Sequence, residues 1–332
     1  MTNATLLLTR SDVVDLLDLD MCISAVEAAF RLHGEGRAQT GVLGIHVPGG
    51  GFHIKAGTLH LSRPYFAAKT NANFPANPAR GLPTIQGVIV LADAELGTPL
   101  AILDSMEITT LRTGAATAVA AKYLAREDAR TVGLIGCGNQ GWVQLRAVRR
   151  VRPLTAACVY DRDRRRAEDL ARVLGPELGM TIDVATGPAA AARAADIVVT
   201  CTSAQHPILD VGDIAPGTFV AAIGADNPEK QEIAPALLAA SRVVVDVLDQ
   251  AATMGDLHHA IAAGVMTRGD VAAELGQIVA GRAAASWGGR QSRDDVIVFD
   301  STGMALQDVA AAAAVYERAQ AAGRGTQVHL AS

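Results

Sequence analysis

The chain has 332 residues, of which 50% are hydrophobic and 19% are charged, and its formal net charge is −5. This composition is typical of a folded globular protein, and the length is sufficient for two domains with separate cores. The acidic balance excludes the basic electrostatic footprint expected of proteins that bind nucleic acid or anionic membranes.

Cysteine, histidine and apolar residues are spaced in ways that exclude further classes. The four cysteines form no CxxC pair, which favours free thiols in a reducing, cytoplasmic compartment. The sequence contains no uninterrupted apolar run of about 18 residues, so we expect neither a membrane span nor a secretion signal. We expect no metal, because the spacing of His46, His53 and His60 does not make them converge.

The first part of the chain mixes helical and strand-like segments. Apolar residues recur at helical spacing over 9–36, which predicts one helix there. A second helix, rich in Thr and Ala, is expected over 105–124. Between them, strand-like pieces separated by Gly and Pro are expected at 44–47, 52–56, 65–69 and 84–92.

From Val132 onwards, strand-like runs alternate with helical segments. Asp163 is expected to cap one of these helices, and an alanine-rich helix is expected over 305–322. This alternation predicts an α/β fold with a doubly wound, Rossmann-type parallel sheet. We expect this dinucleotide-binding domain over 126–304, and an α+β domain formed by 1–125 with 305–332. The strands are expected at 131–135, 156–160, 181–185, 196–201, 218–223, 242–246 and 295–299.

The most informative motif is a glycine-rich turn between a strand and a helix. The strand from Thr131 leads through Gly136-x-Gly138-x-x-Gly141 into a helix. These glycines permit a tight turn, close approach of phosphates to the backbone, and close packing of the helix on the strand. The helix N-terminus then presents N–H groups to an anion.

The position of Asp161 indicates which dinucleotide is bound. Asp161 lies at the end of the next predicted strand, where a carboxylate binds the ribose hydroxyls. Its charge disfavours a 2′-phosphate, so NAD is expected. The nearby arginines at 162 and 164–166 keep NADP open.

Three charged residues outside this turn are candidates for substrate chemistry. Lys69 ends an apolar strand beside a loop of asparagines, although an exposed strand-end lysine is the better explanation of this position taken alone. Arg112 lies in a small, apolar helix and requires an anion, either from a ligand or from a structural ion pair with Asp104 or Glu107. Asp226 follows a predicted parallel strand, where it could act as a general acid or base or cap a turn.

Taken in order, these motifs resemble those of the ornithine cyclodeaminase/mu-crystallin family. The resemblance covers essentially the whole chain, and it implies a homodimer formed through the first domain. It also implies NAD(P) in the second domain and a substrate between the two. The motifs are Lys69 with its Asn/Pro-rich loop, Gly81-Leu-Pro-Thr84, Leu111-Arg112-Thr113-Gly114-Ala115-Ala116, Gly136-x-Gly138-x-Gln140, Gly224-x-Asp226-x-Pro228-x-Lys230-x-Glu232 and Ser301-Thr302-Gly303.

The resemblance implies a role for each matching residue. Arg112 would bind the substrate carboxylate, and Lys69 would lie over the reacting carbon as proton donor or water activator. Asp226 would be the acid/base for the amine or imine. The expected cofactor contacts are Thr113, Gly136, Gly138, Asn139, Gln140, Asp161, Arg162, Thr202 and Ser301.

One departure from the family pattern concerns a substrate-binding cation. Members usually have an arginine in the strand before Pro48, but this chain has none between Arg37 and Arg63. Lys55 lies in the neighbouring segment, and we expect it to supply the missing positive charge.

Together, the motifs and the resemblance predict an NAD-dependent oxidoreductase acting at the α-carbon C–N bond of an L-amino acid or the corresponding imine. Such an enzyme is an amino-acid dehydrogenase or, in reverse, an imine reductase. Two alternatives stay open. The first is an ornithine cyclodeaminase, which forms proline and ammonia and regenerates its NAD. The second is a non-catalytic, mu-crystallin-like protein that binds its ligand together with NAD(P).

Overall fold

The computed structural model describes residues 4–284 and 287–330 and divides into two compact units. One unit comprises Met1–Thr113 with Met304–Ser332, and the other comprises Gly114–Gly303. The division falls within a single helix, α3 (Ser105–Leu124). Within the described residues, no helix combines the length and the apolar character needed to cross a membrane.

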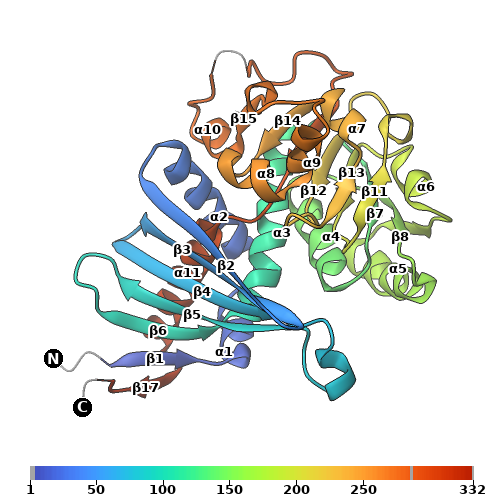
Figure 1. Cartoon of the computed structure of the whole chain (residues 1–332). Helices are drawn as coiled ribbons and strands as arrows, with labels where there is room; N and C mark the ends of the chain where they lie inside the picture. The colour runs from blue at the N-terminus through green and yellow to red at the C-terminus, as the bar shows by residue number, and fades with distance from the viewer. Residues whose placement is uncertain (1–3, 285–286, 331–332) are drawn as a thin grey trace. The chain divides into compact units, whose positions relative to one another are not determined.

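A seven-stranded sheet forms the frame of the first unit (Figure 1). Its strand order is β17-β1-β6-β5-β4-β3-β2, and β1 runs parallel to β6 whereas the other neighbours are antiparallel. The strands are β1 (Thr5–Leu8), β2 (Ala38–Val47), β3 (Gly50–His60), β4 (Pro64–Asn73), β5 (Ile85–Asp93), β6 (Pro99–Asp104) and β17 (Thr326–Val328).

The strand pieces predicted in this unit are confirmed, but the single helix predicted over 9–36 is wrong. The segment forms two helices, α1 (Arg10–Leu16) and α2 (Leu19–Gly34). The break arises because Leu17 adopts an extended conformation and Asp18 caps α2 by accepting a hydrogen bond from the Met21 N–H. A short 3-10 turn, η1 (Asn77–Arg80), lies between β4 and β5.

The alanine-rich helix α11 (Ala305–Ala322) packs on one face of this sheet and on α2. Figure 1 shows it crossing behind the strands. Small residues permit the close approach: a Cβ added at Gly57 in β3 would lie 2.8 Å from Leu306 Cδ2 and 2.7 Å from the Gln39 carbonyl oxygen. Ala305 in the helix and Gly57 in the strand therefore allow the start of α11 to pack closely on β3.

An eight-stranded, entirely parallel sheet forms the second unit, with the order β15-β14-β16-β12-β10-β7-β8-β9. The seven strands predicted there are confirmed, and so is Asp163 as the N-cap of its helix. The strands are β7 (Thr131–Ile135), β8 (Ala156–Tyr160), β9 (Thr181–Val184), β10 (Ile197–Thr200), β12 (Phe219–Ala222), β14 (Arg242–Val245), β15 (Ala273–Glu274) and β16 (Ile297–Asp300).

Helices connect these parallel strands, as a doubly wound sheet requires. A small two-stranded parallel sheet, formed by β11 (Gln205–Leu209) and β13 (Gln231–Ile233), was not predicted. The helices are α4 (Asn139–Val151), α5 (Arg164–Leu178), α6 (Pro188–Ala192), α7 (Pro235–Ala239), α8 (Leu248–Met254), α9 (Asp256–Ala262) and α10 (Leu275–Val279), with 3-10 turns η2 (Val211–Asp213) and η3 (Arg268–Asp270).

Strand register aligns the loops of the second unit along one edge. Ile135, Thr200, Ala222 and Asp300 end four adjacent strands and are paired side by side. The loops that follow β7, β10, β12 and β16 therefore all begin at the C-terminal edge of the sheet, where doubly wound folds bind their ligands.

Candidate functional site

Two buried cations share one buried carboxylate in the first unit. Lys69 Nζ lies 2.7 Å from Asp308 Oδ2, and Arg112 Nε lies 3.2 Å from Asp308 Oδ1. The guanidinium also donates a hydrogen bond of 2.8 Å to Gln307 Oε1. Only 3% of the Lys69 side chain and 8% of the Arg112 side chain are exposed, so these charges depend on one another rather than on water.

The elements that carry these side chains explain why they meet. Lys69 lies in β4 on the face covered by α11, Arg112 lies in α3, and Asp308 lies in the first turn of α11. The N-terminus of a helix favours a carboxylate. Although burial opposes ionisation, Lys69 and Arg112 lower the pKa of Asp308, so its charge persists.

Lys69 is poised to exchange a proton near neutrality. Burial and the nearby Arg112 guanidinium lower the pKa of Lys69 to about 7, although the Asp308 carboxylate favours the ammonium form. The Lys69 ammonium also lies 3.5 Å from Thr109 Oγ1. A lysine with a pKa in this range can act as a proton donor or acceptor at neutral pH.

Lys55 joins this group, as its register shows. It is the direct cross-strand partner of Lys69 between β3 and β4, so both side chains lie on the same face of the sheet. Lys55 also lowers the pKa values of both Lys69 and Asp308 through its charge. The first unit therefore brings together Lys55, Lys69 and Arg112, the three cations predicted to bind substrate.

The ion-pair partners considered for Arg112 from the sequence are wrong. Asp104 accepts two hydrogen bonds from Arg10, of 3.1 and 3.0 Å, and one from the Met106 N–H at the start of α3. The partner of Arg112 is Asp308, which was not among the residues predicted from the sequence. The available signal was an acidic residue in the alanine-rich segment 305–316, because a buried carboxylate there requires a cation.

In the second unit, the glycine turn has the backbone geometry that the motif predicts. Gly136 has a φ of +104°, which disfavours any residue with a side chain. A Cβ at Gly141 would lie 2.2 Å from the Gly136 carbonyl oxygen, whereas a Cβ at Gly138 would meet no atom within 4 Å. Gly136 and Gly141 are thus required by the fold itself, and Gly138 is not.

The helix that follows this turn begins without a side-chain cap. Gly138 is the N-cap of α4, and no side chain of the described residues caps it. Asn139, the first helical residue, is exposed, and Gln140 is half-buried and accepts a 3.2 Å hydrogen bond from Gln144. The first N–H groups of this 13-residue helix therefore have no side-chain cap, and the positive end of its dipole lies at the glycine turn.

Asp161 directly follows β8, as predicted. Its carboxylate accepts hydrogen bonds from the Cys137 N–H (2.8 Å) and the Asp163 N–H (2.9 Å). These bonds hold the carboxylate beside the glycine turn. Arg162, the next residue, is exposed.

The remaining candidates in this unit begin the other loops at the same edge. Thr202 is half-buried after β10, and Asp226 is exposed after β12, where Lys230 lies 2.7 Å from its carboxylate. Ser301 is buried after β16, and its hydroxyl lies 3.4 Å from Asp246 Oδ2. Thr113 belongs to the first unit, where its hydroxyl donates to the Thr109 carbonyl oxygen within α3.

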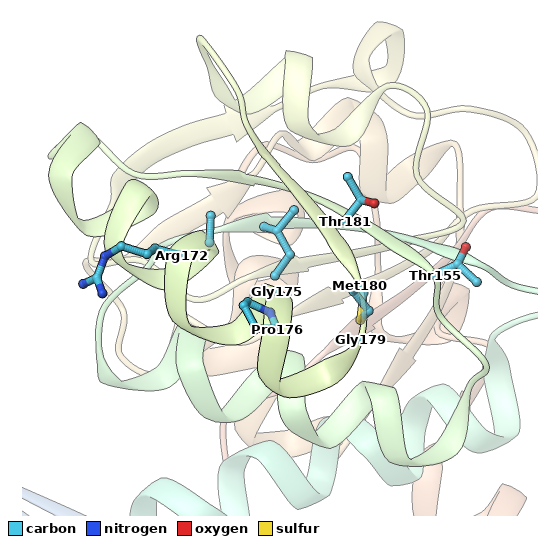
Figure 2. Close-up of a pocket in the computed structure, with 9 residues that line it drawn as sticks. Thr155, Arg172, Gly175, Pro176, Gly179, Met180 and Thr181 are labelled. Carbon is cyan, nitrogen blue, oxygen red and sulfur yellow. The ribbon is translucent and has the colours of Figure 1, made fainter.

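A surface hollow in the second unit lies at the other edge of the sheet. Figure 2 shows its lining, which includes Thr155, Arg172, Gly175 and Thr181. Thr155 precedes β8 and Thr181 begins β9, so the hollow adjoins the N-terminal ends of these strands. It is therefore separate from the edge that carries the predicted cofactor residues.

Within residues 4–284 and 287–330, no group of three or more His, Cys, Asp or Glu side chains could hold a metal ion.

Comparisons with known proteins cover nearly the whole chain. Residues 3–323 match the model of the ornithine cyclodeaminase/mu-crystallin family. An alanine dehydrogenase of Archaeoglobus fulgidus is 38% identical over 324 residues, which are 98% of this chain and 98% of that protein.

Two solved structures are also similar along their whole length. An archaeal alanine dehydrogenase dimer with bound NAD has a TM-score of 0.93 and 36% identity, covering 98% of this chain and 99% of that one. A Δ1-pyrroline-2-carboxylate reductase of Thermococcus litoralis, in complex with NADH and L-proline, has a TM-score of 0.92 and 33% identity. That match covers 98% of this chain and 100% of the other.

Replacing Asp308 tests whether its carboxylate holds the buried cations. We expect Asp308→Asn to lower the free energy of unfolding by about 3–5 kcal/mol, because two buried cations lose their counter-charge. Urea unfolding followed by circular dichroism measures this loss. A matched control is Asp169→Asn, which removes a carboxylate that is 61% exposed and pairs with Arg172, and which we expect to change stability little. Equal effects of the two substitutions would contradict the role of Asp308.

Proposed function

Because the chain belongs to the ornithine cyclodeaminase/mu-crystallin family, we propose that it is an NAD-dependent oxidoreductase acting at the α-carbon C–N bond of an L-amino acid or the corresponding imine. The observation that carries this proposal is the buried arrangement of Lys69 and Arg112 around Asp308. It provides an anion-binding group next to a lysine that can exchange a proton. The named activities of the relatives, alanine dehydrogenase and pyrroline-2-carboxylate reductase, both concern such a C–N bond.

Arg112 would bind the substrate carboxylate, with Lys55 as a second cation. A guanidinium matches a carboxylate through two parallel hydrogen bonds, and contacts with Asp308 and Gln307 fix the orientation of this one. A fixed carboxylate anchor orients the α-carbon of the substrate. If Lys69 is neutral, the charges of Lys55, Arg112 and Asp308 leave one positive charge, which a substrate carboxylate balances.

Lys69 and Asp226 would handle the protons of the reaction. The pKa of Lys69, lowered to about 7, allows it to donate a proton or to activate water. Asp226 would serve the amine or imine nitrogen as acid/base, and in the resting protein its carboxylate lies 2.7 Å from Lys230 Nζ.

The residues at the C-terminal edge of the second sheet fit NAD. The turn at Gly136 and Gly138, with the uncapped start of α4 at Asn139 and Gln140, would hold the pyrophosphate. Asp161 would bind the adenosine ribose hydroxyls, with Arg162 beside it, and its charge favours NAD over NADP. Thr113, Thr202 and Ser301 would supply further contacts. When bound, NAD accepts or returns the hydride of the substrate α-carbon.

A panel assay tests the reaction directly. With NAD, we expect at least one L-amino acid to produce net reduced cofactor, measured by absorbance in the reduced-nicotinamide band, with ammonia assayed in parallel.

We expect Asp226→Asn to retain NAD binding and to lose turnover by about 100-fold or more, because the acid/base group is removed.

Other results of this assay would favour the two alternatives. Ammonia from ornithine without net cofactor reduction would mean a cyclodeaminase. Binding of NAD and ligand with no turnover of any substrate would mean a non-catalytic binding protein. Full activity of Asp226→Asn would remove Asp226 from the acid/base role.

Substitutions at two glycines of the turn distinguish an effect on cofactor binding from an effect on folding. We expect Gly138→Ala to fold with unchanged stability but to weaken NAD binding on the order of tenfold or more, because its methyl group would occupy the phosphate approach. Gly141→Ala, by contrast, should lower stability by about 1–3 kcal/mol through its clash with the Gly136 carbonyl. Calorimetric titration with NAD and urea unfolding measure the two effects. Unchanged NAD affinity in Gly138→Ala would argue against a pyrophosphate at this turn.

A homodimer is part of the proposal, and the uncovered face of the first sheet supports it. Leu43, Ile54, Thr70 and Val88 are paired in one row across β2–β5. This row lies on the face opposite to that of Lys69, because neighbouring residues in a strand point to opposite faces. Large apolar side chains that are exposed on this face are Leu43, Ile45, Phe52, Val88 and Val90. An apolar face of this kind typically contacts another protein surface, and the archaeal relative is a dimer.

A charge placed on this face tests the dimer. Leu43 is 55% exposed, and we expect Leu43→Asp to shift the protein from dimer to monomer in light scattering coupled to gel filtration. Leu96 is 76% exposed but lies in the turn between β5 and β6, so Leu96→Asp should leave the dimer intact. A monomeric wild-type protein would refute this part of the proposal.

A cytoplasmic location is also proposed, and cell fractionation tests it.

A further inference from the structure

Glu232 is a fully buried carboxylate in the second unit. It lies in the short strand β13, and it accepts four hydrogen bonds. Its Oε1 accepts from the Thr202 N–H (2.6 Å) and the Thr202 hydroxyl (2.7 Å). Its Oε2 accepts from the Thr200 hydroxyl (2.7 Å) and the Gly224 N–H (2.8 Å). Burial raises the pKa of Glu232, and these four hydrogen bonds oppose the rise.

These donors come from two different loops at the C-terminal edge of the sheet. Thr200 is the last residue of β10, Thr202 lies in the loop that follows it, and Gly224 follows the neighbouring strand β12. Each carboxylate oxygen accepts one backbone N–H, one from each loop. Glu232 therefore ties the two loops together. The approach is close enough to require glycine, because a Cβ at Gly224 would lie 2.4 Å from the Thr202 carbonyl oxygen and 2.5 Å from Glu232 Oε1.

A second carboxylate holds Glu232 itself in place. Asp256, at the start of α9, accepts hydrogen bonds from the Glu232 N–H (2.8 Å) and the Ile233 N–H (2.9 Å). Asp300 in turn accepts from the Leu257 N–H (2.8 Å) in the same helix. Two layers of buried hydrogen bonds thus fix β13, so the Glu232 side chain reaches the loops from a rigid base.

We propose that Glu232 is a positioning residue, whose carboxylate fixes Thr202 and the Gly224–Asp226 segment at the edge of the sheet. This inference rests on the proposed function, which assigns Thr202 to cofactor binding and Asp226 to acid/base chemistry. Glu232 touches neither cofactor nor substrate in this role. It acts by holding the two loops in one arrangement, as a preorganised site requires.

The chemistry of the tether makes a glutamine substitution informative. Glutamine has the size of glutamate, but only one of its two terminal atoms accepts a hydrogen bond. Because each oxygen of Glu232 faces a backbone N–H, the amide must direct its NH2 group at either Thr202 or Gly224, whichever way it is turned. One loop is therefore released even though the side chain still fits.

The experiment compares Glu232→Gln with a control at the opposite edge of the same sheet. Asp196 precedes β10 and its carboxylate also accepts backbone N–H bonds, from Arg130 (2.8 Å) and Thr131 (3.0 Å). We expect Glu232→Gln to raise the Kd for NAD and to lower kcat, each on the order of tenfold. Asp196→Asn should leave both values within about twofold of the wild type, even where urea unfolding shows that it is less stable.

The outcomes separate positioning from a general structural effect. Unchanged NAD Kd and kcat in Glu232→Gln, or equal changes in Asp196→Asn, would overturn the proposal. If Glu232→Gln does not fold, Thr200→Val decides instead, because it removes one donor to Oε2 at a buried strand position that suits valine. We expect a smaller rise in NAD Kd for Thr200→Val, and no rise would overturn the proposal.

The experiment also distinguishes failure of this inference from failure of the proposed function. If the wild type binds NAD but converts no amino or imino acid, the proposed reaction fails, and the NAD Kd of Glu232→Gln still decides whether Glu232 positions the Thr202 loop. If the wild type binds no NAD, both proposals fall.

Discussion

The carboxylate of Asp308 lies between two buried cations that come from distant points of the chain. Lys69 belongs to β4, Arg112 belongs to α3, and Asp308 belongs to α11 near the end of the chain. The arrangement requires α11 to pack on the sheet, and Gly57 in β3, which lies against Ala305 and Leu306 at the start of α11, makes that packing possible. The same carboxylate keeps Arg112 oriented and limits how far burial lowers the pKa of Lys69. Both the packing of the first unit and the pKa of Lys69 therefore depend on one interaction.

In the second unit, glycine residues and hydrogen bonds to backbone N–H groups fix the arrangement of the loops. Gly136 and Gly141 allow the turn and the helix to approach each other, and Glu232 joins the loops that follow β10 and β12. Both devices act at the C-terminal edge of the parallel sheet, where the N-terminus of α4 points. The first unit is thus characterised by buried ion pairs, and the second by backbone N–H groups held in fixed positions.

The sequence predicted those features that local patterns determine. Most of the predicted strands of the parallel sheet are apolar runs bounded by turn residues, and the glycine turn has a fixed spacing, so both could be located correctly. Asp308 and Glu232 could not be assigned roles in this way. Asp308 is separated from Lys69 and Arg112 by most of the chain, and Glu232 lies in a three-residue strand with no alternation of its own. Only the packing of α11 and β13 reveals their partners.

The pKa of Lys69 tests most directly whether its buried site prepares it for proton transfer. Selective ε-13C labelling of lysine, with Lys69 assigned by comparison with Lys69→Arg, allows its titration to be followed by NMR. We expect a midpoint of about 7, so that Lys69 is mostly protonated below that pH and mostly neutral above it. A midpoint near the ordinary lysine value of 10.5 would contradict this, because Lys69 would then remain an ammonium ion that only pairs with Asp308.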